Sequence, residues 1–291
     1  MERTYINEVQ KEIGSTVKVQ GFIENLRNSK YMAFIVLKDI TGKLQITVEK
    51  ADHPDLVDTI DKLTPDSVIT VTGKVMENDY VKMGGIEMIP EAIEVESIAD
   101  ALPIARKAIA ATKKKKAVER SSIDQRIDYR WIDLRTDENQ LMFKAQSCFV
   151  NAMRKFLLYR NFIEIHTPKL IAAASESGSE VFKVDYFDRN AYLAQSPQFY
   201  KQMAMAAGFE RIFETGPVFR AEKSYTNKHS TEFSGFDLEF SYITSFKDVM
   251  KMEEELLTAG LQAVKDNYGD QIKELFGQEV IVPTTPFPVV K

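Results

Sequence analysis

The sequence predicts a five-stranded β-barrel followed by an α+β domain with an antiparallel sheet. Three observations predict this arrangement. Residues 15–97 show the pattern of three strands, a short helix and two strands, and residues 137–160 repeat apolar side chains at helical spacing. Residues 212–222 and 233–243 resemble two paired antiparallel strands. The chain has 291 residues, of which 44% are hydrophobic, so it is long enough for two domains with separate cores.

The barrel strands are predicted from alternating apolar and polar residues. They are VKVQGFIENL, FIVLKD, KLQITVE, SVITVTGKVM and GIEMIPEAIEV. A helix, DHPDLVDTIDKL, lies between the third and fourth strands, with Pro54 in its first turn. This order is that of an OB-fold barrel, which binds single-stranded nucleic acid by stacking bases on aromatic side chains. We therefore expect residues 1–104 to form an OB-fold domain.

A basic linker is expected over residues 105–136. Residues 101–130 contain nine Lys or Arg against three Asp or Glu, including Lys113–Lys116. The whole chain has a formal net charge of −5, which argues against general nucleic-acid binding. A local basic band on an acidic protein can still contact RNA, and a solvated linker would have the same composition. Both interpretations stay open.

The second domain is predicted over residues 137–291. Its first helix, over residues 137–160, has one apolar stripe. The stripe consists of Leu141, Ala145, Cys148, Phe149, Ala152, Met153, Phe156 and Leu157. A strand is expected at 162–170, a short helix at 198–207 and a longer helix at 246–266. This order of strands and helices is typical of an α+β domain.

Several classes of protein are disfavoured by composition. No apolar run approaches the length of a membrane span, and the charged N-terminus lacks the apolar core of a signal peptide. Cys148 is the single cysteine, so a disulfide framework is excluded, and we expect it in the core. His53 and Cys148 form no metal pattern, and His166 is expected to be structural, so no zinc site is predicted. These features fit a cytoplasmic protein.

The most informative segment is VFRAEKSYTNKHSTEFSGFDLEF, at 218–240. Arg220 and Glu222 lie two residues apart, hence on one face of a strand. Arg220 offers a planar fork to a phosphate, and Lys228 and His229 can reach a polyphosphate tail. Phe233 offers a ring on which a purine can stack. An exposed, charged hairpin would look similar in outline.

This segment resembles motif 2 of the class II aminoacyl-tRNA synthetases, whose core is FRxE, a loop and a strand. The string FIEIHTPKL at 162–170 resembles their motif 1, and AAASESGSEVF at 172–182 resembles the loop that closes over the amino acid. The strings AQSPQFYKQ at 194–202 and GFDLE at 235–239 resemble the aspartate-specific members of archaeal type. The asparagine-specific members are the nearest alternative.

The resemblance implies ATP-dependent attachment of L-aspartate to tRNA(Asp) through an aspartyl-adenylate. Whether tRNA(Asn) is also charged stays open, because a few contacts to one anticodon base decide it. ATP and Mg²⁺ are the implied cofactors, with a homodimer formed through motif 1. Arg220 is expected to contact the α-phosphate and Glu222 the adenine amino group or the tRNA end, both as catalytic residues. Lys228 and His229 are expected near the phosphates and Phe233 against adenine.

The resemblance also implies an aspartate pocket. Lys201 is the matched cation for the substrate side chain, with Glu176, Ser196, Gln198 and Asp237 as polar and acidic partners. A lysine here selects a carboxylate over an amide, because asparagine would leave the buried charge unpaired.

In the barrel, the resemblance implies that Arg27 and Phe34 bind the anticodon. Taken alone, Phe34 in the run FIVL would more often belong to a core. Archaeal-type relatives often carry aromatic residues around this segment, where this chain has Glu24 and Asn25, so the contacts to the neighbouring anticodon bases stay open.

The family's motif 3, a glycine-rich segment ending in arginine, has no counterpart after Phe240. The glycines that follow, Gly260, Gly269 and Gly277, are widely spaced. The second domain is therefore expected to be a partial catalytic domain, C-terminally incomplete, and its Mg²⁺ ligands are expected outside this chain. Two alternatives stay open: part of a longer synthetase, or a shortened, non-catalytic tRNA-binding relative.

Overall fold

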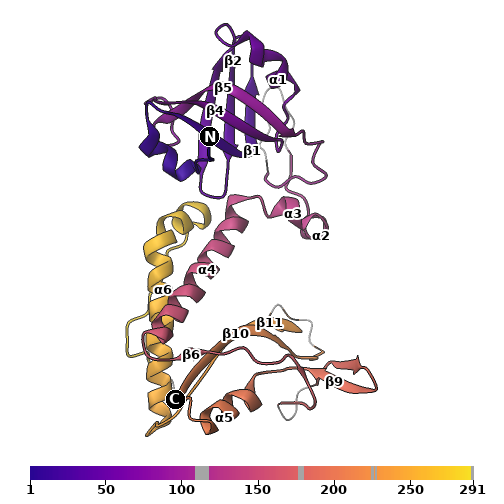
Figure 1. Cartoon of the computed structure of the whole chain (residues 1–291), viewed down its shortest axis with the longest axis vertical. Helices are drawn as coiled ribbons and strands as arrows, with labels where there is room; N and C mark the ends of the chain where they lie inside the picture. Colours follow the sequence, from indigo (N-terminus) through magenta and orange to yellow (C-terminus); the bar gives the residue numbers. More distant parts are fainter. Residues whose placement is uncertain (109–117, 176–179, 224–225, 227, 290–291) are drawn as a thin grey trace. The chain divides into compact units, whose positions relative to one another are not determined.

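The computed structural model describes residues 1–108, 118–175, 180–223, 226 and 228–289. These residues form two compact units, Met1–Tyr129 and Arg130–Lys291 (Figure 1). None of the helices in the described part of the chain has the length and apolarity that crossing a bilayer requires.

The first unit is a closed five-stranded barrel, which confirms the predicted OB fold. Its strands are β1 (Thr16–Asn28), β2 (Met32–Lys38), β3 (Lys43–Glu49), β4 (Val68–Glu77) and β5 (Ile86–Ser97). They close in the order β1-β2-β3-β5-β4. The predicted helix lies between β3 and β4 as a 3₁₀ turn, η2 (Pro54–Leu56), followed by α1 (Val57–Lys62).

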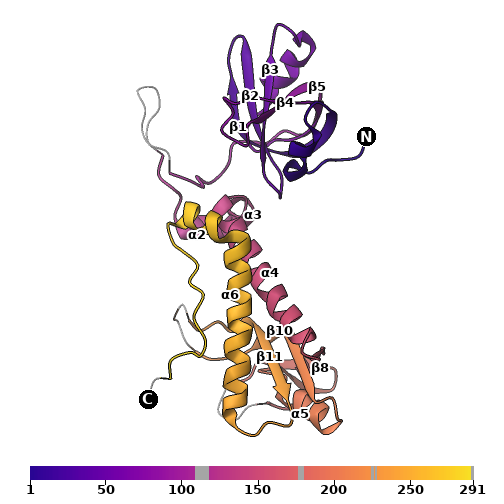
Figure 2. The ribbon, with the colours of Figure 1, turned by 90° about the vertical axis from the view of Figure 1, so that its left-hand side faces the viewer.

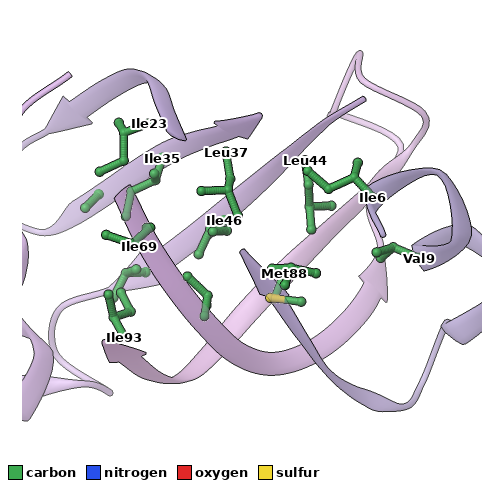
Figure 3. Close-up of a cluster of buried hydrophobic side chains, with 14 of the residues drawn as sticks. Ile6, Val9, Ile23, Ile35, Leu37, Leu44, Ile46, Ile69, Met88 and Ile93 are labelled. Atoms are coloured by element: carbon green, nitrogen blue, oxygen red, sulfur yellow. The ribbon is translucent and has the colours of Figure 1, made fainter. Parts of the chain in front are cut away.

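The barrel core is built from the inward-facing residue of each alternating pair. Figure 3 shows these side chains converging from all five strands, together with Ile6 and Val9 of a 3₁₀ helix, η1 (Ile6–Glu12), that the sequence did not predict. Two glycines allow neighbouring strands to approach closely. A Cβ atom on Gly21 would lie 2.3 Å from the carbonyl oxygen of Lys38, and one on Gly73 would lie 2.4 Å from that of Ile89.

Two short helices precede the sheet of the second unit. These are α2 (Ile123–Asp128), which belongs to the first unit, and α3 (Arg130–Asp133). The long helix α4 (Asp137–Leu158) follows and packs beside α6 (Phe246–Phe276), as both views show (Figures 1 and 2). Cys148, expected in the core, lies partly buried on α4 with its Sγ 3.5 Å from the Ala263 carbonyl oxygen of α6.

The sheet of the second unit has three strands in the order β11-β10-β6. Strand β10 (Arg211–Phe219) pairs antiparallel with β11 (Glu232–Phe240), as predicted, and parallel with β6 (Ile163–Glu164). A second sheet contains β7 (Leu170–Ile171), β9 (Arg189–Leu193) and β8 (Lys183–Tyr186), and α5 (Gln198–Ala206) follows it.

The prediction of a single strand at 162–170 is wrong. The segment divides into β6 and β7, which belong to different sheets. Pro168 between them has no backbone N–H, and the N–H of Thr167 donates to the side chain of Glu214 rather than to a neighbouring strand. The helix expected at 246–266 continues for ten more residues and ends at Gly277, whose φ of 67° is left-handed.

Gly260 on α6 is where this helix meets α4, and its replacement tests the packing. A Cβ atom there would lie 2.6 Å from the ring of Phe149 and 3.1 Å from Met153. We expect Gly260→Ala to lower the free energy of unfolding by on the order of 1–2 kcal/mol, because overpacking outweighs the gain in helix propensity. Gly269→Ala on the same helix is the matched control, since its nearest contact would be 3.7 Å away. Thermal or urea unfolding measures both, and equal effects would contradict this packing.

Candidate active site

The paired strands β10 and β11 carry the candidate site on one face. Side chains alternate along a strand, so every second residue of β10 faces the same side as its partner on β11. The cross-strand pairs on this face are Glu214 with Asp237, Gly216 with Gly235, and Val218 with Phe233. These residues line an open pocket of about 90 Å³. The pocket has a carboxylate end, a glycine floor and an aromatic end.

Lys201 lies beside the carboxylate end. It sits in the first turn of α5, and its Nζ donates to Asp237 Oδ1 at 2.8 Å and lies 3.2 Å from Glu239 Oε2. Its side chain is only 14% exposed. Burial disfavours the charged ammonium, but the hydrogen bonds and charges of Asp237 and Glu239 outweigh burial and raise the Lys201 pKa above its usual value. The lysine is therefore held as a cation between two carboxylates.

The turn before α5 supplies polar atoms to the same pocket. Gln195 and Ser196 line it, and the backbone N–H of Gln198 donates to Ser196 Oγ at 3.3 Å. Gln195 is fully buried, and its side-chain oxygen accepts the N–H of Ser175 at 3.2 Å. Of the residues expected here, Ser196 and Asp237 line the pocket, Lys201 contacts Asp237, and Gln198 begins α5 without lining it. Glu176 lies outside the described residues.

The aromatic end of the pocket contains Arg220, which was expected to contact a phosphate. Arg220 and Phe233 both line the pocket, with the guanidinium carbon 5.5 Å from the ring centroid. Glu222, Lys228 and His229, expected in the same site, are exposed in the loop between β10 and β11 and do not line the pocket. The ring of His229 is hydrogen-bonded to Thr226, a local contact of the loop.

An ion pair that the sequence analysis did not identify forms another wall of the pocket. Glu214 is buried, and its carboxylate accepts the N–H of Thr167 at 2.9 Å, the hydroxyl of Thr167 at 2.7 Å and Nζ of Lys169 at 2.8 Å. Burial raises the Glu214 pKa, but Lys169 and Thr167 outweigh it and hold the pKa below its usual value. The sequence signal that could have identified this ion pair is the charged residue within the apolar strand IFETGPVF.

The barrel carries a separate candidate site on its outer face. Arg27 and Phe34 are cross-strand partners of β1 and β2, with the guanidinium carbon 6.0 Å from the ring centroid. They line a broad depression together with other residues that include Tyr80 and Glu87. Phe34 is half-buried and lies between the fully buried Ala33 and Ile35, so its ring faces the opposite side from the core.

The described residues supply no metal site. No group of three His, Cys, Asp or Glu side chains among them lies close enough to hold an ion. The pocket on β10 and β11 offers cations, carboxylates and aromatic rings for a ligand. This combination suits a zwitterion joined to a phosphate and a planar base.

Sequence comparison assigns both units to known families. Residues 122–290 match the family described as tRNA synthetases class II (D, K and N), and residues 17–96 match the OB-fold nucleic acid binding domain. Since the first match spans more than half of the sequence, the chain belongs to the class II tRNA synthetases.

Two individual relatives that are similar over most of this chain are named as aspartate–tRNA ligases. The chain is 43% identical over 276 residues to the aspartate–tRNA(Asp/Asn) ligase of Methanopyrus kandleri, covering 94% of this chain and 62% of the relative. It is 41% identical over 259 residues to the aspartate–tRNA(Asp) ligase of Picrophilus torridus, covering 89% and 58%. The chain thus spans about three fifths of the length of these relatives.

Solved structures show the same architecture. The asparaginyl-tRNA synthetase of Pyrococcus horikoshii, complexed with asparaginyl-adenylate, superposes with a TM-score of 0.84 at 30% identity, over 94% of this chain and 61% of that one. A putative aspartyl-tRNA synthetase from Leishmania major Friedlin gives a TM-score of 0.82 at 29% identity, over 96% and 56%.

Proposed function

We propose that this chain takes part in the ATP-dependent attachment of L-aspartate to tRNA(Asp), through an aspartyl-adenylate. The observation that carries this proposal is Lys201, held as a cation beside a pocket whose other end contains Arg220 and Phe233. Such a pocket suits an amino acid with a negative side chain at one end and a nucleotide at the other. The likeness to two archaeal aspartate–tRNA ligases supports the same substrate.

At the amino-acid end, the substrate binds between Lys201 and Asp237, which form an ion pair in its absence. The side-chain carboxylate of aspartate takes one side of the Lys201 ammonium, and the substrate ammonium is received by Asp237. Ser196 lines this end of the pocket, and Gln198 and Glu176 are proposed as further polar partners of the substrate. Asparagine in the same pocket would offer Lys201 a neutral amide in place of a charged acceptor, so it would gain less from this cation than aspartate does.

At the nucleotide end, Arg220 contacts the α-phosphate and Phe233 stacks on adenine. Glu222, Lys228 and His229, which are exposed in the neighbouring loop, are proposed to bind the adenine and the polyphosphate. The α-carboxylate of aspartate attacks the α-phosphorus, and the bond to pyrophosphate breaks. A hydroxyl of the tRNA 3′-terminal ribose then attacks the acyl carbon, and AMP leaves. Positioning and charge neutralisation carry both steps, and no covalent intermediate with the protein is required.

The metal of this reaction is proposed to be Mg²⁺, which accompanies ATP. The described residues hold no set of carboxylates for it, so we assign it no ligands here. Homodimer formation through the segment around Pro168 is a further part of the proposal.

The barrel is proposed to bind the anticodon loop, with a base stacked on Phe34 beside Arg27. Whether tRNA(Asn) is also charged is a separate question, because the name of one archaeal relative includes tRNA(Asn) and the name of the other does not. The deciding experiment is aminoacylation with labelled aspartate, using transcripts of both tRNAs and the complete product of the gene. Charging of tRNA(Asp) is the expected result, and failure to charge either transcript contradicts the proposal.

Two alternatives each have one observation in their favour. The match of residues 17–96 to an OB-fold nucleic acid binding domain does not depend on the second unit, so it also fits a chain that binds tRNA without catalysis. The likeness to an asparaginyl-tRNA synthetase favours asparagine as the substrate. In the first case the complete product binds tRNA but forms no adenylate, and in the second it activates asparagine at least as well as aspartate.

A further inference from the structure

The ion pair between Lys169 and Glu214 lies on the wall of the candidate pocket and has no part in the proposed function so far. We propose that Lys169 is a further binding residue of this site, which contacts the anionic group that joins the amino acid to the nucleoside. Glu214 is then its positioning residue. The inference rests on the proposed function, because it names a residue for the same ligand.

The position of Lys169 supports this role. Both Lys169 and Glu214 line the pocket, and Lys169 lies next to the glycine floor. A Cβ atom built on Gly216 would lie 3.6 Å from Lys169 Cε and 3.8 Å from its Nζ. The ammonium is therefore near the middle of the pocket, between the carboxylate end and the ring of Phe233.

The lack of side chains at Gly216 and Gly235 leaves space for a ligand beside Lys169. A Cβ atom on Gly216 or Gly235 would meet no protein atom closer than 3.5 Å, so packing within the protein permits side chains at both positions. Such side chains would instead fill the pocket between Glu214 and Phe233. A ligand that reaches from one end to the other must cross this floor, and its central group lies beside Lys169.

The hydrogen bonds of Lys169 leave room for a ligand. An ammonium has three N–H donors, and Nζ gives one to Glu214 Oε1 at 2.8 Å and one to Thr167 Oγ1 at 3.1 Å. Within the described part of the chain no acceptor is recorded for the third donor, which is available to an anion in the pocket. Glu214 is held by three hydrogen bonds, so it fixes the position of the lysine. Buried ion pairs contribute little to stability on balance, which favours a functional reason for this one.

The test compares two probes, of which one carries the central anion together with the aspartyl group and the other carries neither. The acyl-sulfamate 5′-O-(L-aspartylsulfamoyl)adenosine carries a negative charge in place of the phosphate, and adenosine carries none. Calorimetry measures both on the wild-type chain and on Lys169→Met. We expect the variant to bind the acyl-sulfamate at least about tenfold more weakly, as for a lost hydrogen bond between charged groups, and to bind adenosine unchanged.

Three further variants separate this role from a structural one. Lys169→Arg keeps the charge and is expected to recover most of the affinity, whereas Lys169→Gln can still donate to Glu214 and is expected to bind as weakly as Lys169→Met. Glu214→Gln frees the lysine and gives an intermediate loss. Lys183→Met, at an exposed position of β8, is the control and is expected to bind both probes as wild type does.

Equal affinity of wild type and Lys169→Met for the acyl-sulfamate would overturn this inference alone. Parallel loss of both probes would also overturn it, because it would assign the lysine a structural role. If the wild-type chain and the complete gene product bind neither probe, the proposed function falls together with the inference.

Discussion

Replacing Lys201 with methionine is expected to slow aspartate activation by a factor on the order of a thousand. Methionine has a similar length but no charge, so Asp237 and Glu239 lose the cation that lies 2.8 Å and 3.2 Å from them. Breaking a buried pair by removing one partner costs about 3–5 kcal/mol. The partly exposed carboxylates lower this cost, but the substrate carboxylate then loses the same cation in the transition state.

The measurement is aspartate-dependent exchange of labelled pyrophosphate into ATP, with the complete gene product. Lys201→Arg is expected to retain part of the activity because it keeps the charge, although its planar head has a different shape. Lys155→Met, at an exposed position of α4, is the matched control and is expected to behave as wild type. Near-normal exchange by Lys201→Met would show that the side chain of the amino acid is recognised elsewhere.

Replacing Phe34 with alanine is expected to weaken tRNA binding by about 1–3 kcal/mol, the value of one base stack. Phe34 lies half-buried on the outer face of β2, opposite the core, and its ring is beside Arg27. Pyrophosphate exchange is expected to stay unchanged, because that step needs no tRNA. The effect is therefore expected in the affinity for tRNA alone.

Filter binding or fluorescence titration with tRNA(Asp) transcript checks this expectation. Tyr31→Ala is the matched control, since Tyr31 is 69% exposed close to the same strand but does not line the depression. Phe34→Tyr keeps a ring and is expected to retain most of the affinity. If exchange and thermal stability fall together with tRNA affinity, Phe34 supports the fold rather than the anticodon.

The barrel could be predicted almost strand by strand, because the alternation of apolar and polar residues is visible within each strand alone. Alternation along each strand separates a buried face from a solvated one, and the same alternation places Phe34 on the outer face. The 3₁₀ helix that contains Ile6 and Val9 was not predicted, because only its contact with the finished barrel buries these two residues.

The second unit was less predictable where long-range contacts decide the structure. The segment 162–170 is apolar enough for one strand, yet Thr167 donates to Glu214, which is 47 residues further along the chain. No pattern within the segment contains this partner. The extension of α6 to Phe276 was also not predicted, because the stretch after residue 266 is polar and its helical pattern is weak.

The same distinction applies to the candidate site. Arg220, Phe233, Lys201 and Asp237 were identified from motifs, and the structure brings Arg220, Phe233 and Asp237 to one pocket, with Lys201 bonded to Asp237. Lys169 and Glu214 were missed because neither is unusual alone. Only their pairing across 45 residues makes them part of the site.

The most direct test of the central claim is pyrophosphate exchange with aspartate and asparagine in competition. The claim is that the pocket over β10 and β11, with its cation Lys201, selects an amino acid with a negative side chain. The complete gene product is predicted to exchange pyrophosphate with aspartate and to be only weakly inhibited by a large excess of asparagine. Equal use of the two amino acids, or exchange that depends on asparagine alone, would contradict it.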